Sequence, residues 1–446
     1  MKTLAEHKEQ LLKLQRLTFD YFLHYTNPQN GLIADNSRTK APCSITAVGL
    51  ALASYPIAVE RGYLSRDEAV QKTLATLRFF WQSDQGQEPN ATGYKGFYYH
   101  FLDMETGRRH DQSELSTIDT AFLIAGALTA GQYFDHTSDE EQEIRQLADA
   151  LYTRVDWQWA LNGGRLVSMG WWPENGFYDS RWQGYTEALL LYVLGLASPT
   201  YPLPAKSYDT WIETYEWQRY YGIECLYAPP LFIHQLSHLW IDFRGIQDAY
   251  MRGKKIDYFE NSRRATYIQQ QYAIENRKNF KGYGKWTWGI TASDGPGDVT
   301  KVVDGVERRF WGYMARGVPG GPDDGTLSPW GVVASLPFAP EIVLPTIDYY
   351  NEHYPFMISD YGFRCSFNPT FPDGAEGWVS EGYYGLDQGP IVAMIENSLS
   401  GLVWHLMRRC PYIVTGLRRA GFEGGWLDEV ANGQSQIDQT TSATDQ

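Results

Sequence analysis

The sequence predicts an all-α fold in which paired helices close into a toroid, with long loops and short β-hairpins gathered on one face. Apolar residues recur at helical spacing through the first half of the chain. The links between these segments alternate between short and long, as expected where inner and outer helices follow one another. No Pro- and Ser-rich linker divides the chain, so we expect one domain over residues 1–430.

Six helices are expected in the first half of the chain. Two of them begin at capping boxes, Ser65–Glu68 and Ser138–Glu141, in which a hydroxyl and a carboxylate satisfy free amides of the first turn. The spacing of apolar residues predicts the other four. The expected ranges are 4–25, 45–59, 65–81, 116–134, a helix that starts at 138, and 184–197.

The connections between these helices differ in length. Residues 62–64 and 135–137 form tight links, whereas residues 83–112 and 156–181 are long enough to hold a β-hairpin each. The hairpins are expected at residues 97–104 and 159–168. Long loops without function are uncommon in compact domains, so we expect the long links to elaborate one end of the toroid.

The second half of the chain continues the pattern less clearly. Helices are expected at residues 231–243, 257–279, 340–353 and 386–409. Residues 282–329 form a long loop rich in Gly, Asp, Pro and aromatic residues. Residues 431–446 are polar, and we expect them to be disordered.

The charge of the chain limits the partners it can have. The formal net charge is -15, and no basic run is longer than a pair such as Arg263-Arg264. Nucleic acid and anionic membrane surfaces would be repelled, so neither is expected as a partner. A neutral substrate such as a glucan is compatible with this charge.

No metal or cofactor is expected. The chain has four cysteines, Cys43, Cys225, Cys365 and Cys410. They lie far apart and form no CxxC pair, so we expect free, buried thiols and no zinc site. His234 and His238 have the i,i+4 spacing of metal ligands, but no HExxH motif and no third ligand accompany them. One face of an amphipathic helix is the better interpretation of this pair.

The N-terminal residues MKTLAEHKEQ contain no apolar run that could form the core of a signal peptide. No segment approaches the ~18 continuous apolar residues of a membrane-spanning helix. The sequence as written therefore predicts a cytoplasmic protein, and a periplasmic one if a native leader has been removed.

Aromatic residues make up 15% of the chain, with 16 Trp and 31 Tyr. A core rarely needs so many, because each buried indole N–H or phenol O–H must find a hydrogen-bond partner. Sugar rings bind to flat aromatic faces, while carboxylates, amides and hydroxyls bond to their hydroxyl groups. Aromatic residues occur together with Gly, and in all but 309–313 with a carboxylate, in residues 170–174, 180–187, 288–296, 309–313 and 377–384. This pattern predicts a carbohydrate-active enzyme with an open aromatic cleft.

Tryptophans in loops beside Gly and Pro are the preferred platforms for stacking on sugar rings, because full burial is less common there. These are Trp171, Trp172, Trp286 and Trp288. Further aromatic candidates for substrate binding are Trp182, Tyr185 and Trp311.

Two carboxylates near the start of apolar helices are the catalytic candidates. Asp119 follows Ser116, and the pair could simply cap a helix N-terminus. If Asp119 is catalytic, a helix N-terminus favours the charged form and so suits a base. Glu187 could likewise be an ordinary first-turn glutamate, but Trp182 and Tyr185 would desolvate its carboxyl. Desolvation raises a carboxyl pKa, as a general acid near neutral pH requires.

Three more carboxylates could bind sugar hydroxyls. Glu114 is either such a ligand or a solvated surface charge. Asp294 and Asp387 lie beside Gly-Pro turns, where Asp often caps its own backbone, so capping and a ligand role are both open.

Six ordered segments carry a resemblance to a known family. They are ELSTIDTA (114–121), GYTEALLLYVLGLASPTYP (184–202), WGITASDGP (288–296), DGTLSPWGVVASLPF (324–338), YGFRCSF (361–367) and GLDQGPIVAMIEN (385–397). Together they resemble the bacterial glucoamylase-like domain family, classified as glycoside hydrolase family 144. The resemblance runs from about residue 17 to residue 413, nearly the whole chain.

The resemblance implies an (α/α)6 barrel that hydrolyses β-1,2-linked glucan, with inversion at the anomeric carbon and no cofactor. The family's characterised activity is endo-β-1,2-glucanase. The resemblance also implies that Asp119 and Glu187 match the functional carboxylates, with Asp387 and Asp294 near the substrate.

One segment departs from the family pattern. Residues 297–318 are longer than the short Gly- and Tyr-rich link expected there, which leaves endo versus exo action open. Other functions also stay open. The alternatives are a glucan transglycosylase, an exo-acting glucosidase or glucoamylase-like hydrolase of the same fold, and a noncatalytic glucan-binding protein.

Overall fold

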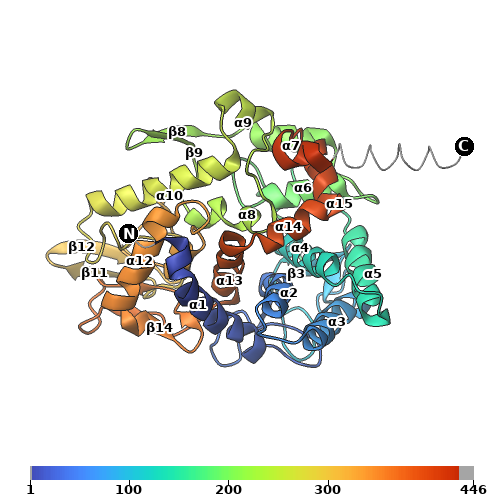
Figure 1. Ribbon diagram of the computed structural model, residues 1–446, viewed down its shortest axis with the longest axis horizontal. Coiled ribbons are helices and arrows are strands. Elements are labelled where there is room, and N and C mark those ends of the chain that lie inside the picture. Colours follow the sequence, from blue (N-terminus) through green and yellow to red (C-terminus); the bar gives the residue numbers. More distant parts are fainter. Residues whose placement is uncertain (1–2, 431–446) are drawn as a thin grey trace, which may run out of the picture.

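The computed structural model describes residues 3–430, and within them six helices buried on nearly every face form an inner ring (Figure 1). They are α2 (Ile45–Glu60), α4 (Thr117–Tyr133), α6 (Leu189–Ala197), α8 (Leu236–Trp240), α11 (Pro329–Val333) and α13 (Gly385–Leu399). Their sequences are mostly apolar or rich in Ala and Gly, so they have no wide polar face to turn toward solvent. The ring closes where α11 packs on α13 and α13 packs on α2.

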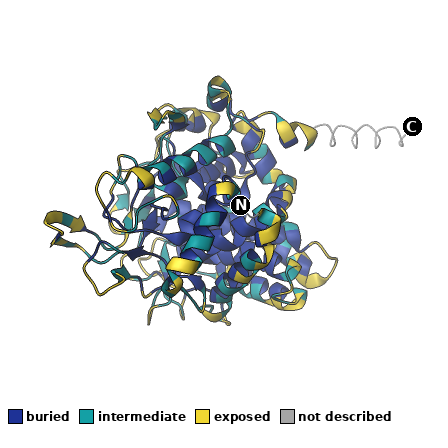
Figure 2. Cartoon of the chain, turned by 60° about the vertical axis from the view of Figure 1, so that its left-hand side comes forward, coloured by how far each residue is buried: buried dark blue, intermediate teal, exposed yellow. Residues whose placement is uncertain are grey.

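Amphipathic helices cover this ring from outside. They are α1 (Leu4–His24), α3 (Arg66–Gln82), α5 (Asp139–Arg154), α7 (Ala205–Ile212), α10 (Tyr258–Glu275), α12 (Pro340–His353) and α15 (Pro411–Arg419). Each buries one stripe of residues and leaves a polar face outside, which Figure 2 shows as exposed residues around a buried centre. Helix α1 packs on α13, α5 on α4, α12 on α11 and α15 on α6. The arrangement is an (α/α)6 barrel, as predicted.

Two glycines set the distance between α2 and α4. A Cβ atom on Gly126 would lie 2.0 Å from the carbonyl oxygen of Gly49. A Cβ atom on Gly49 would lie 2.3 Å from the carbonyl oxygen of Phe122. Both contacts are with backbone, which cannot move aside, so only glycine permits this approach.

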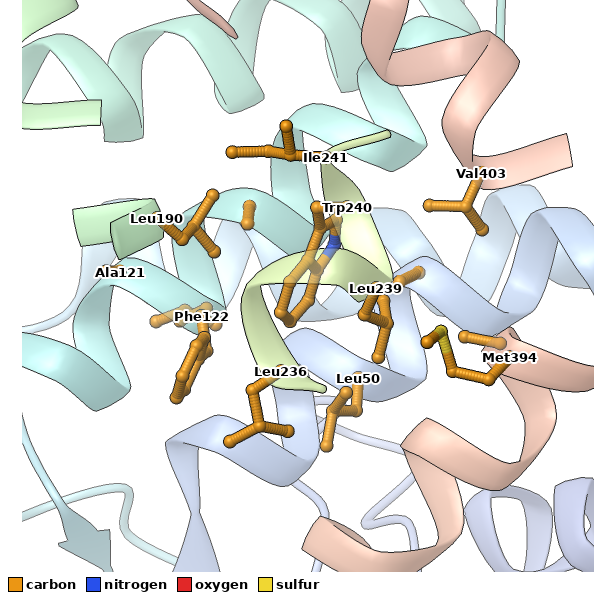
Figure 3. Packing of buried hydrophobic residues seen from close by; sticks show 14 of the residues in the cluster. Leu50, Ala121, Phe122, Leu190, Leu236, Leu239, Trp240, Ile241, Met394 and Val403 are labelled. Atoms are coloured by element: carbon orange, nitrogen blue, oxygen red, sulfur yellow. The ribbon is translucent and has the colours of Figure 1, made fainter. Parts of the chain in front are cut away.

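Side chains from five elements meet inside the ring (Figure 3). Leu50 of α2, Phe122 of α4, Leu190 of α6 and Met394 of α13 surround Trp240 of α8. The rings of Phe122 and Trp240 stack with their centroids 5.6 Å apart. This packing fills the middle of the barrel, so the open space lies at its end.

An antiparallel five-stranded sheet joins the two long links at one end of the barrel. Its order is β2 (Gly93–Tyr94), β3 (Phe97–Tyr99), β5 (Leu115–Ser116), β6 (Gly170–Trp172) and β7 (Gly176–Phe177). Next to it, β1 (Cys43–Ser44) pairs with β4 (Phe101–Leu102). Strands β1 and β5 lead directly into the inner helices α2 and α4. The long links therefore gather on one face, as predicted.

The remaining elements are short. Further two-stranded pairs are β8 (Trp217–Tyr220) with β9 (Ile223–Leu226), β10 (Ala292–Ser293) with β13 (Met314–Ala315), β11 (Val299–Val303) with β12 (Val306–Phe310), β14 (Ile358–Ser359) with β15 (Gly362–Phe363), and β16 (Phe367–Asn368) with β17 (Trp378–Val379). Two short helices are α9 (Ala249–Lys254) and α14 (Leu402–Arg409), and 3-10 turns occupy Trp159–Leu161, Leu231–His234 and Pro355–Met357. The β11–β12 hairpin projects to the left in Figure 1 and lies within residues 297–318, the segment expected to depart from the family pattern.

Several predicted elements need correction. The helix predicted at 184–197 begins only at Leu189, after Gly184 adopts a positive φ of 71°. The one predicted at 386–409 is two helices, because Gly401 has a φ of 72° between them. Residues 159–168 hold a 3-10 turn that ends at left-handed Asn162 and not a hairpin. The segment 431–446 lies outside the described residues.

The helix predicted at 231–243 is also divided, into the 3-10 turn Leu231–His234 and α8. None of the helices in residues 3–430 combines the length and the apolar character needed to cross a bilayer.

Candidate active site

A cavity of about 650 Å³ opens beside the N-terminal ends of α2, α4 and α13. Four carboxylates line it: Asp35, Glu114, Asp119 and Glu187. Helix N-termini carry partial positive charge, so this end of the barrel suits negative groups. The two carboxylates predicted to be catalytic therefore face one common space.

Asp119 lies in the first turn of α4, where Ser116 is the N-cap. The backbone amide of Asp119 donates to Ser116 Oγ at 3.2 Å, so the cap is made by the serine. Both carboxylate oxygens of Asp119 accept hydroxyl hydrogen bonds, Oδ1 from Thr46 and Oδ2 from Ser116, each at 2.5 Å. The cap and the cavity-facing carboxylate thus coexist, and two hydroxyl donors fix the direction of that carboxylate.

Glu187 lies in the turn directly before α6, where Ser237 Oγ donates to its carbonyl oxygen at 3.0 Å. Trp182 and Phe232 line the same cavity. Burial raises the pKa of Glu187 to about 7; a backbone hydrogen bond opposes this rise, and the negative charge of Asp119 adds a smaller increase. A carboxyl with this pKa can hold a proton near neutral pH, as a general acid must.

His100 lies between β3 and β4 and was not singled out in the sequence. Its Nδ1 is 2.8 Å from Glu114 Oε1, and its Nε2 is 3.6 Å from Asp119 Oδ1. Burial lowers the pKa of His100, but the charges of Asp119 and Glu114 outweigh it and raise the value to about 9. Among the described residues, this trio offers metal-ligand atoms within 4.8 Å of one another. A protonated histidine would already supply the positive charge there.

Asp35 is the second lining residue that sequence reasoning missed. It lies in the link between α1 and α2, and Asn36 donates to its Oδ2 at 2.9 Å. Burial raises the pKa of Asp35, with a smaller contribution from the charge of Asp119, while His100 opposes the rise. In the sequence, the one indication of Asp35 as a site residue was its position after the Asn30-Gly31 turn. Only long-range contacts bring its carboxylate to the cavity.

Aromatic side chains form part of the wall of the cavity. They are Phe101, Phe122, Tyr178, Trp182, Phe232, Tyr313 and Tyr384. Of the aromatic residues predicted to bind substrate, only Trp182 is among the described residues that line the cavity. Its indole Nε1 donates to Thr117 Oγ1 at 3.0 Å. This hydrogen bond fixes the orientation of the Trp182 ring.

Two of the predicted aromatic contacts are wrong. Trp288 is 0% exposed, and its Nε1 donates to Thr346 Oγ1 at 2.9 Å inside the core. Tyr185 is buried behind the cavity wall, with its ring 5.8 Å from that of Tyr258. Neither ring can stack on a sugar, because each face is covered by protein.

The other predicted tryptophans are not among the residues that line the cavity. The rings of Tyr94 and Trp159 pack on Trp171 at 5.3 and 5.7 Å. Trp172 donates to the carbonyl oxygen of Gln112 at 3.1 Å. Trp286 lines a separate surface depression, and Trp311 lies beside the β11–β12 hairpin.

Asp294 lies just behind the cavity, where it joins three loops. Its Oδ2 accepts hydrogen bonds from Arg38 at 2.5 Å and from Ser380 at 2.9 Å. Arg38 also donates to the hydroxyl of Tyr384, a cavity residue, at 2.6 Å. Asp294 therefore supports the wall of the site through Arg38.

Asp387 lies in the first turn of α13 and is 1% exposed. Neither of its carboxylate oxygens has a hydrogen-bond partner among the described residues. Burial raises the pKa of Asp387 well above its usual range. The Cys365 thiol opposes this rise, and the charges of Asp35 and Asp294 add to it. Its neighbour Leu386 lines the cavity, so Asp387 is within one residue of it.

Known proteins similar to this chain act on glucans. The Glycoamylase family model, described as "Putative glucoamylase", matches residues 179–411. The chain is 30% identical to the exo β-1,2-glucooligosaccharide sophorohydrolase (non-reducing end) of Parabacteroides distasonis, over 92% of this chain. It spans only 58% of that relative's length.

Solved structures similar to this chain include a putative glucoamylase and an endo-β-1,2-glucanase. A "putative glucoamylase" from Bacteroides uniformis superposes with a TM-score of 0.83 and 30% identity, covering 96% of this chain and 99% of that one. The endo-β-1,2-glucanase of Chitinophaga pinensis, solved with sophorotriose and glucose, superposes with a TM-score of 0.81 and 27% identity. That match covers 96% of this chain and 100% of the other.

Proposed function

This chain belongs to the glucoamylase-like family, glycoside hydrolase family 144, and on that premise we propose that it hydrolyses β-1,2-linked glucan. The observation that carries the proposal is the pairing of Glu187 with Asp119 in one cavity. One carboxyl has a pKa of about 7, and the other is held as a hydrogen-bond acceptor. Glycoside hydrolysis needs such an unequal pair.

The two carboxyl groups divide the chemistry. Glu187 donates its proton to the glycosidic oxygen as the bond to the anomeric carbon breaks. Asp119 accepts a proton from the attacking water, directly or through a substrate hydroxyl. Trp182 lines the same cavity as Glu187 and in this scheme offers a flat face to the sugar ring. No residue in this scheme requires a metal ion or a cofactor.

The reaction is proposed to invert the anomeric configuration. An inverting pair of carboxyl groups stands roughly 6.5–9.5 Å apart, which leaves room for water, whereas a retaining pair is about 5–5.5 Å apart. The cavity of about 650 Å³ has space for both a sugar ring and a water molecule beside the acid.

Product analysis tests the proposal. Purified protein and its Glu187→Gln variant are incubated separately with linear β-1,2-glucan, starch and β-1,3-glucan. We expect short β-1,2-linked sugars from the first substrate with the unaltered protein alone. Products from starch alone would overturn the linkage, and binding without products would favour a glucan-binding protein.

The mode of attack is a separate question, because the similar proteins include an exo-acting sophorohydrolase and an endo-β-1,2-glucanase. The same digests decide it for this chain. A ladder of oligosaccharides early in the reaction indicates endo cleavage, and sophorose alone indicates exo cleavage. Products longer than an added oligosaccharide would indicate transglycosylation.

A further inference from the structure

The charges around the cavity are unbalanced. Its lining contains four carboxylates, whereas His100 is the single basic side chain among the described residues that form it. Arg38 lies nearby but contacts Asp294 and Tyr384. Close carboxylates repel one another and favour protonation, so the ionisation of the catalytic groups depends on the one cation among them.

The contacts of His100 require it to be that cation. One ring nitrogen faces Glu114 at 2.8 Å and the other faces Asp119 at 3.6 Å. A neutral imidazole has one N–H, so its second nitrogen would point a lone pair at a carboxylate. Protonation of both nitrogens removes this repulsion. Asp35 adds a third negative charge on the side of the α1–α2 link.

The ring is also held in place. The backbone amide of His100 donates to the carbonyl oxygen of Glu114 at 2.9 Å, and its own carbonyl accepts from Ile45 at 3.2 Å. The imidazole stacks on Phe101 with centroids 4.0 Å apart and planes 13° from parallel. His100 thus joins the five-stranded sheet to the first residue of α2.

From this geometry we infer that His100 is a positioning residue that, as an imidazolium, keeps Asp119 and Glu114 ionised and oriented while Glu187 retains its proton. The inference rests on the proposed function and deepens it, because it says what makes two similar carboxyl groups behave differently. Asp119 receives the cation and two hydroxyl donors, whereas no side-chain donor among the described residues reaches the Glu187 carboxyl.

The same contacts argue against a metal ion at this trio. Glu114 and Asp119 approach opposite nitrogens of one ring, and a metal ion can bind only one of these nitrogens. A divalent ion bound to either nitrogen would have to displace the proton that this nitrogen directs at its carboxylate. The proton therefore takes the place that a metal would occupy in a three-ligand site.

The first test is kinetic and uses the full chain with linear β-1,2-glucan. His100→Gln keeps a hydrogen-bond donor and loses the charge. We expect kcat to fall by roughly 10²-fold, the cost of misplacing a catalytic group, with a smaller change in KM. The pH profile should change as well, because the positive charge of His100 beside Asp119 and Glu114 is lost.

His110→Gln is the matched control. His110 lies in the same link, is partly exposed and contacts Asp111 at 3.4 Å outside the cavity. The His110→Gln substitution should leave kcat and the pH profile unchanged. If His100→Gln merely lowers the melting temperature and keeps the original kcat and pH profile, its role is structural and the inference is wrong. Recovery of His100→Gln by a divalent cation would also overturn it.

The second test does not use activity. NMR titration of ¹³C-labelled histidine follows the His100 ring, which should stay protonated well above pH 7, since its pKa is about 9. Asp119→Asn and Glu114→Gln should each lower that pKa. A titration near the ordinary value of about 6.5 would overturn the inference. If the unaltered protein fails to cleave the glucan, the proposed function fails, while this titration still decides the charge of His100.

Discussion

Glu187 and Asp119 line the same cavity in opposite electrostatic settings. Burial and then the charge of Asp119 raise the pKa of Glu187 to about 7, whereas Asp119 accepts hydroxyl hydrogen bonds on both oxygens. Two carboxyl groups with different environments provide an acid and a base at one pH. This difference assigns the acid role to Glu187 and the base role to Asp119 in the proposed mechanism, and the first three predictions follow from it.

The first prediction concerns pH. In the proposed mechanism the protonated form of Glu187 is the active acid, so kcat/KM should fall as the pH rises through about 7. The measurement is kcat/KM on β-1,2-glucan between pH 4 and 9, taken within the range where the protein stays folded. A rate that stays level up to pH 9 would show that Glu187 is not the acid.

The second prediction separates the two roles. A substrate with a good leaving group needs little protonation, so Glu187→Gln should recover much of its lost rate on such a substrate. Asp119→Asn should not recover, because the attacking water still lacks its base. Each variant should lose at least ~10²-fold on the natural glucan. If Asp119→Asn is the variant that recovers, the two assignments must be exchanged.

The third prediction concerns stereochemistry. Inversion at a β-linked glucosyl residue releases the α-anomer first. An NMR time course of the early products, recorded faster than mutarotation, should therefore show the α-anomer before the β-anomer. Initial β-anomer would mean that Asp119 and Glu187 form a retaining pair.

Local signals predicted the fold better than the site. The capping boxes at Ser65 and Ser138 give helix starts at Arg66 and Asp139, because a cap depends only on neighbouring residues. The break at Gly401 was missed, since its positive φ leaves no mark that distinguishes it from other glycines.

The site depended on contacts between distant segments. Asp119 and Glu187, which line one cavity, could be predicted as candidates because each lies at or just before the start of an apolar helix. His100 and Asp35 reach the cavity from separate links, so their position at the site depends on long-range contacts that neighbouring residues do not reveal. Trp288 was predicted to bind substrate but is fully buried, because Thr346 accepts the hydrogen bond of its indole N–H inside the core.

The fourth prediction concerns the support of the cavity wall. Arg316 and Asp324 form a salt bridge in which both side chains are 0% exposed, with Nε to Oδ1 at 2.8 Å. Arg316→Met would leave Asp324 buried and unpaired, at a cost of about 3–5 kcal/mol. Arg316 follows β13, whose Ala315 lines the cavity, so activity should fall with stability.

Thermal unfolding checks this prediction against an exposed pair. Arg309 and Asp298 lie 3.4 Å apart with both side chains largely in solvent. Such a pair contributes only about 0–1 kcal/mol, so Arg309→Met should melt close to the unaltered protein. Equal melting temperatures for the two variants would mean that the buried pair does not stabilise the wall.

The fifth prediction concerns Asp387, whose buried carboxyl has no hydrogen-bond partner among the described residues and a pKa well above its usual range. Burial is the main cause, because a charge there would lose its hydration. The folded protein therefore keeps a proton on Asp387 that the unfolded chain releases above about pH 4. Since the folded state binds the extra proton, stability should decline as the pH rises from about 4 toward the folded pKa.

Asp387→Asn tests this directly, because the amide has nearly the same shape and never ionises. The melting temperature of the variant minus that of the unaltered protein should increase steadily between pH 4.5 and 8. Asp360→Asn, which changes an exposed carboxylate, should show no such trend. If Asp387→Asn is instead less stable by a constant amount at every pH, the amide disturbs packing and Asp387 does not titrate in this range. A deficit that grows as the pH rises would mean that Asp387 is ionised and stabilised in the folded protein.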